Sequence, residues 1–87
     1  MERPDGRREQ FEDARRAADA AHDAVGDAED ELVAAEGARA DARGPAESQR
    51  ADARLVQAEA DWLDRQTEAE HATRERESAR GHLTDPP

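Results

Sequence analysis

Apolar residues recur along this chain at alternating spacings of three and four positions, in two long stretches that a short break separates. The first stretch starts at Phe11 and the second ends at Leu83. This heptad spacing puts the apolar residues on one side of a helix and is typical of a coiled-coil seam. Most seam residues are alanine, and the larger ones are Phe11, Val25, Leu32, Leu55, Trp62 and Leu83.

The break between the two stretches lies at Gly44-Pro45. Glycine suits the left-handed residue that follows a helix, and proline suits the first turn of the next helix. Asp5 is a candidate N-cap of the first helix, and Gly81 is a candidate end of the second. The sequence therefore predicts one helical hairpin over 6–81, with helices over 6–43 and 46–81, a turn at 44–45, and tails at 1–5 and 82–87.

The two seams match when the chain is folded back at this break. Residues that face each other have numbers that add to about 90, so that Leu32 meets Ala58 and Ala28 meets Trp62. Large residues mostly meet alanine, which lets the helices approach closely. The predicted fold is therefore all-α: a two-helix antiparallel coiled-coil hairpin with an alanine-rich seam. We expect it to dimerise into a four-helix bundle or to dock on a partner helix.

Composition alone favours a different conclusion, because 41% of the residues are charged and the net charge is −10. Such a balance is typical of disordered chains. Alanine, glutamate, glutamine and arginine are strong helix formers, however, and strand formers are rare. Because the seam holds few large side chains, we expect the free hairpin to be marginally stable and to gain stability by association. A chain that folds only on binding is the alternative.

The sequence gives weak indications of location. It contains no apolar run of the length of a membrane span or a signal peptide, which predicts a cytoplasmic protein without membrane contact. It also contains no cysteine, which excludes disulfides and thiolate metal sites. Every basic residue is arginine, a usage typical of GC-rich bacterial genes.

Residues with catalytic potential are scattered. His22, His71 and His82 are far apart, and only His71 with Glu75 has the spacing of two ligands on one helical face. A two-helix hairpin offers no cleft that would desolvate its carboxylates. We therefore expect no enzyme activity, no cofactor and no metal. Trp62 is expected to anchor the seam rather than stack on a ligand. The seam arginines Arg39, Arg65 and Arg76 are expected to reach flanking acids.

A second apolar stripe lies outside the seam, on the half of the hairpin nearest the turn. Val33 and Val56 are expected at the same level, because their numbers add to nearly the same value as the seam pairs. Scattered exposed apolar residues are ordinary, but here few large apolar residues exist at all. The sequence therefore predicts a partner-binding patch formed by Val33, Ala40, Ala53, Val56, Ala60 and Leu63.

Acidic residues gather in the middle of the hairpin, since no arginine occurs from Ala17 to Ala38, whereas arginines gather at the open end. The predicted acidic face consists of Asp19, Asp23, Asp27, Glu29, Asp30, Glu36, Asp52 and Glu59. Crowding is expected to raise the pKa values of the acids in this stretch, Glu31 included, so that stability falls as the pH rises. Binding of nucleic acid is not expected, because phosphates repel such a surface.

These features predict a non-catalytic module for protein–protein interaction or assembly, whose partner is another protein or a second copy. The alternative is an acidic inhibitor, antitoxin-like or DNA-mimicking, that covers a basic protein surface. A third possibility is a hairpin that probes a cavity with its tip, as some RNA-polymerase regulators do. Self-association through the patch should tolerate salt, whereas an acidic inhibitor should lose affinity steeply as salt rises.

Overall fold

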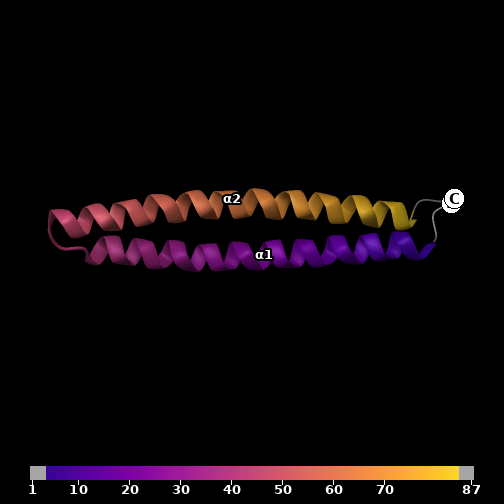
Figure 1. The fold of residues 1–87 in the computed structure, drawn as a ribbon, viewed down its shortest axis with the longest axis horizontal. Helices are drawn as coiled ribbons and strands as arrows, with labels where there is room; N and C mark the ends of the chain where they lie inside the picture. Colours follow the sequence, from indigo (N-terminus) through magenta and orange to yellow (C-terminus); the bar gives the residue numbers. More distant parts are fainter. Residues whose placement is uncertain (1–3, 85–87) are drawn as a thin grey trace.

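The computed structural model describes residues 4–84 and contains two helices, α1 (Pro4–Asp41) and α2 (Gly44–Thr84). The helices lie side by side along their whole length, and a short connection joins them at one end (Figure 1). The hairpin is a rod of 66 × 16 × 13 Å. No residue in this described range belongs to a strand. The predicted all-α antiparallel hairpin is therefore confirmed.

The turn is two residues earlier than predicted. Helix α1 ends at Asp41, and the backbone N–H of Ala42 donates to the carbonyl of Arg39 at 3.3 Å, which tightens the last turn. Gly44 has a φ of +80°, a left-handed conformation that a residue with a side chain rarely adopts. It begins α2, and Pro45 then occupies the first turn, where its missing N–H is no loss. The connection therefore consists of residues 42–43 instead of 44–45.

The outer ends of the helices also differ from the prediction. Helix α1 begins at Pro4, so Asp5 lies inside the first turn rather than before it. Helix α2 continues through Gly81 to Thr84, because a single glycine weakens a helix by only about 1 kcal/mol and does not by itself end it. Of the predicted tails, 1–3 and 85–87 lie outside the described residues. The side chains of residues 4–5 and 82–84, including Leu83, lie outside the described part as well.

The core consists of alanine. Among the described residues the buried ones are Ala18, Ala28, Ala35, Ala51, Ala58 and Ala69, and each of them is a predicted seam residue. The larger seam side chains are only half-buried: Phe11, Val25, Leu32, Leu55 and Trp62. Two helices enclose a methyl group between them but cover only one side of a larger side chain.

Polar contacts between the two helices within residues 4–84 test the predicted register. Arg39 pairs with Asp52 near the turn, Glu31 with Arg54 further along, and His22 with Thr73 in the open half. The residue numbers in these pairs add to about 91, 85 and 95, values that lie on both sides of the 90 predicted from the seams. The helices are therefore aligned as the heptads predict.

An elongated hairpin leaves much of its surface in water. The accessible surface is 6727 Å², whereas a compact protein of 9.6 kDa exposes about 5,100 Å². Neither described helix is both long enough and apolar enough to cross a membrane.

Candidate functional site

The heptad divides the hairpin into two sides, which differ in chemistry. We count the heptads from Phe11 in α1 and from Leu55 in α2. The positions one and four residues after the start of each heptad lie on one side of the hairpin. The positions two and six residues after the start lie on the other side. The contact of His22 with Thr73 joins two residues of the first kind, and that of Glu31 with Arg54 joins two of the second. We call the first side the patch flank and the second the bridged flank.

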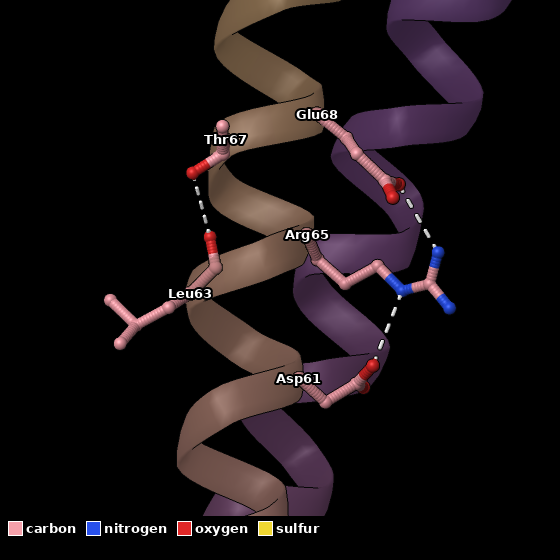
Figure 2. Close-up of polar contacts among 5 residues, drawn as sticks. All are labelled: Asp61, Leu63, Arg65, Thr67 and Glu68. Carbon is pink, nitrogen blue, oxygen red and sulfur yellow. Dashed lines mark hydrogen bonds and ion pairs between the residues drawn. The ribbon is translucent and has the colours of Figure 1, made fainter.

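The patch flank carries the largest exposed aliphatic side chains of the described chain. Val33 is 68% exposed, Val56 is 66% exposed and Leu63 is 56% exposed. In Figure 2, Leu63 points away from α1 and away from the ion pairs of Arg65. Of the predicted patch, Ala40 shares this flank with the three larger residues. Ala53 and Ala60 are exposed too, but they lie further round α2, on its outer side.

A groove continues the patch flank toward the open end of the hairpin. It has a volume of about 460 Å³ and is lined by His22, Val25, Gln66, Ala69, Glu70, Thr73 and Arg74. The imidazole Nε2 of His22 and the Thr73 hydroxyl, both in its lining, lie 3.1 Å apart in a hydrogen bond between the two helices. The groove exists because the seam residues at this level are mostly alanines, which leave space beside the larger Val25.

Several charges of the bridged flank are paired within the chain. Arg54 donates two hydrogen bonds to the Glu31 carboxylate, at 2.8 Å and 3.2 Å. Arg65 leaves the seam and reaches Glu68 at 3.1 Å and Asp61 at 3.6 Å, as Figure 2 shows. All of these side chains stay about half exposed. These charges therefore need no partner molecule.

The contact with Arg54 overturns one expectation about the acidic residues. Its hydrogen bond, together with its charge, lowers the pKa of Glu31 below the ordinary value, and the same contact raises the pKa of Arg54. Crowding was expected to raise the pKa of Glu31. The expectation fails there because an arginine of the other helix lies directly opposite.

The predicted acidic face is otherwise unpaired. Asp52 pairs with Arg39, but no other member makes an ion pair or side-chain hydrogen bond within residues 4–84: Asp19, Asp23, Asp27, Glu29, Asp30, Glu36 and Glu59. Two of them also face each other. Moving two heptads toward the turn from His22 and Thr73 leads to Glu36 and Glu59, so like charges meet on the patch flank.

The seam arginines behave as expected. Besides Arg39 and Arg65, Arg76 reaches an acid, Glu77, at 3.4 Å. Trp62 sits half-buried in the seam, and its indole N–H is enclosed without an acceptor among the described residues. Its position fits the expected role as an anchor.

Features of a chemical site are sparse. The described chain brings no three metal-ligating side chains together. His71 lies 3.6 Å from the Glu75 carboxylate on one exposed face of α2, while His22 contacts Thr73 instead. The strongest candidate site is therefore the patch flank, a surface suited to contact with another molecule.

No protein-family model, curated protein or solved structure matches this chain. The sequence did not predict the groove beside the patch residues. The available signal was the run of alanine-rich seam layers in the open half of the hairpin. What the sequence did not reveal is that His22 and Thr73 meet across the resulting gap.

Proposed function

We propose that this protein is a non-catalytic interaction or assembly module that binds another protein molecule through its patch flank. One observation carries the proposal: within the described part of the chain the buried residues are all alanine, while Val33, Val56 and Leu63 are more than half exposed. A chain with so few large aliphatic side chains gains hydrophobic stabilisation from them only if another surface covers them.

Photo-cross-linking in cells tests this proposal. A photoreactive amino acid at Val56 or at Leu63 should yield cross-linked protein. The same amino acid at Gln57 or Asp64, one position further along and also exposed, should yield little. Equal cross-linking at all four positions, or none at any of them, would contradict a specific role of the patch flank.

A second candidate, an acidic inhibitor that covers a basic protein surface, has its own support in the seven unpaired acids. An ion-paired carboxylate already has its counter-charge, whereas an unpaired one is free to accept an arginine or lysine of a partner. Such binding should weaken steeply as salt rises, and it should survive substitution of Leu63. Binding through the apolar patch should show the reverse behaviour.

A further inference from the structure

The patch flank is divided along its length into a half with protrusions and a half with hollows. Val33, Val56 and Leu63 protrude in the half near the turn. The open half holds the groove beside His22 and Thr73, and then a second hollow of about 340 Å³. That hollow is lined by Phe11, Arg15, Asp19, Arg76, Glu77 and Arg80.

Charge follows the same division. The patch-flank position four residues after the seam is occupied on α1, from the open end toward the turn, by Arg8, Arg15, His22, Glu29 and Glu36. This row is therefore basic at the open end and acidic near the turn, whereas the positions one residue after the seam carry acids in the open half: Glu12, Asp19, Glu70 and Glu77. Neither Arg15 nor Glu36 makes an ion pair within the described chain, so both are open to a partner.

A surface whose two halves complement each other fits a second copy of itself in reverse. We propose that two hairpins stack patch flank on patch flank, antiparallel, and form a four-helix bundle. This inference rests on the proposed function and adds to it the identity, direction and register of the partner. The two-fold axis lies in the interface between the two flanks and runs perpendicular to the rods. It passes the groove near Val25 and Gln66, about midway along each rod.

This register brings the complementary features together. Rotation about the axis carries Leu63 of each copy to the groove of the other, and Val33 and Val56 to the level of the hollow beside Phe11. The same rotation carries Glu36 to the level of Arg15. In this one arrangement, protruding aliphatic side chains therefore face hollows, and Glu36 faces Arg15 of the other copy.

The area is sufficient for a stable dimer. A flank of 66 × 16 Å gives a footprint of about 1,000 Å² for each copy, and stable interfaces bury about 800 Å² on each side. Because the axis lies near the middle of the rod, the two copies overlap along almost their whole length. Parallel stacking gives the same area, but it places Glu36 of one copy near Glu59 of the other, and acids then meet acids.

Cysteine cross-linking reads the register directly, because the natural chain contains no cysteine. Gln66→Cys lies next to the axis and should form a disulfide between two identical chains under mild oxidation. Arg15→Cys and Glu36→Cys should each stay largely monomeric alone but cross-link when the two proteins are mixed. Asp64→Cys, exposed on the bridged side, is the matched control and should remain monomeric.

A charge exchange tests the same contact in the uncrosslinked protein. Arg15→Glu and Glu36→Arg should each weaken dimerisation about tenfold in sedimentation equilibrium, and the double variant should recover most of the loss. Leu63→Asp should also weaken the dimer at unchanged helicity. Circular dichroism on each variant shows whether the hairpin itself is intact.

Several outcomes would overturn the inference. Cross-linking of Glu36→Cys with Glu59→Cys, in place of Arg15→Cys, would mean parallel stacking. A monomer at high micromolar concentration, with wild-type helicity, would exclude the second copy as occupant. If photo-cross-linking from Val56 then still captured a different protein, the proposed function would stand while the dimer would fall. If no cross-link formed, both would fail.

Discussion

The two flanks are built from the same heptads, yet they differ in their charge pairing and in their exposed apolar side chains. On the bridged flank, Arg54 pairs with Glu31, and Arg65 pairs with Asp61 and Glu68. On the patch flank, Glu36 faces Glu59, and Leu63 projects into water. An isolated hairpin would be more stable if ion pairs joined its helices on both flanks. This difference is the reason for proposing the patch flank, and not the bridged flank, as the partner-binding surface.

The largest effect on stability is expected from the same substitution at two adjacent residues, one in the seam and one on the patch flank. Leu32→Asp buries a charge between the helices and should lower the free energy of unfolding by about 3 kcal/mol or more, enough to unfold a marginal hairpin. Val33→Asp places the same charge at an exposed position and should leave the helicity of the monomer unchanged. Circular dichroism during urea titration measures both. Equal destabilisation by the two substitutions would mean that Val33 is packed rather than exposed.

A smaller effect, opposite in sign on the two flanks, is expected when single charges are removed. Glu36→Gln with Glu59→Gln removes repulsion and should raise the melting temperature by a few degrees. Glu31→Gln removes an attraction to Arg54 and should lower it slightly, since exposed ion pairs contribute little. The three substitutions are nearly isosteric, so packing is unchanged. Melts in low salt, where screening is weakest, should show the contrast best. A loss of stability on both flanks would contradict the division between them.

The smallest effect concerns the pH dependence of the bridged flank. The pKa of Glu31 is lowered in the folded protein by its hydrogen bond to Arg54, so the unfolded chain binds its proton more readily. The stability from this pair is therefore present above the ordinary glutamate pKa and is lost as the pH falls through the lowered value. The difference in stability between wild type and Glu31→Gln should be complete at neutral pH and vanish once the pH lies below the lowered pKa of Glu31. A difference that persists unchanged in acid would mean that the pair is not the cause.

The fold could be predicted because the two heptad seams match when the chain folds back at the turn. Few arrangements of the helices other than an antiparallel hairpin bury both seams. Phe11, Leu32 and Trp62 lie in the seam where their spacing placed them. The ends of the helices were less predictable: Gly81 permits a helix to end there but does not force it to, and the short turn begins after Asp41 instead of Arg43.

The electrostatics are less predictable, because the charge pattern along one helix does not show which charges of the other helix lie opposite. The stretch around Glu31 contains no arginine, but Arg54 approaches from the other helix and reverses the direction of the pKa shift. The groove could not be predicted from the sequence for a similar reason. Its lining combines His22 and Val25 of α1 with Gln66 and Thr73 of α2, and only the paired structure brings them together.

The matched heptads of α1 and α2 also determine which length changes the protein can accept. Inserting one residue in either helix rotates everything beyond it by about 100°, which exchanges the faces and destroys the pairing. Inserting seven residues into each helix at matching levels keeps both faces in phase and lengthens the rod by about 10 Å. The hairpin is thus a unit whose reach can change in whole heptads while the character of each flank is preserved.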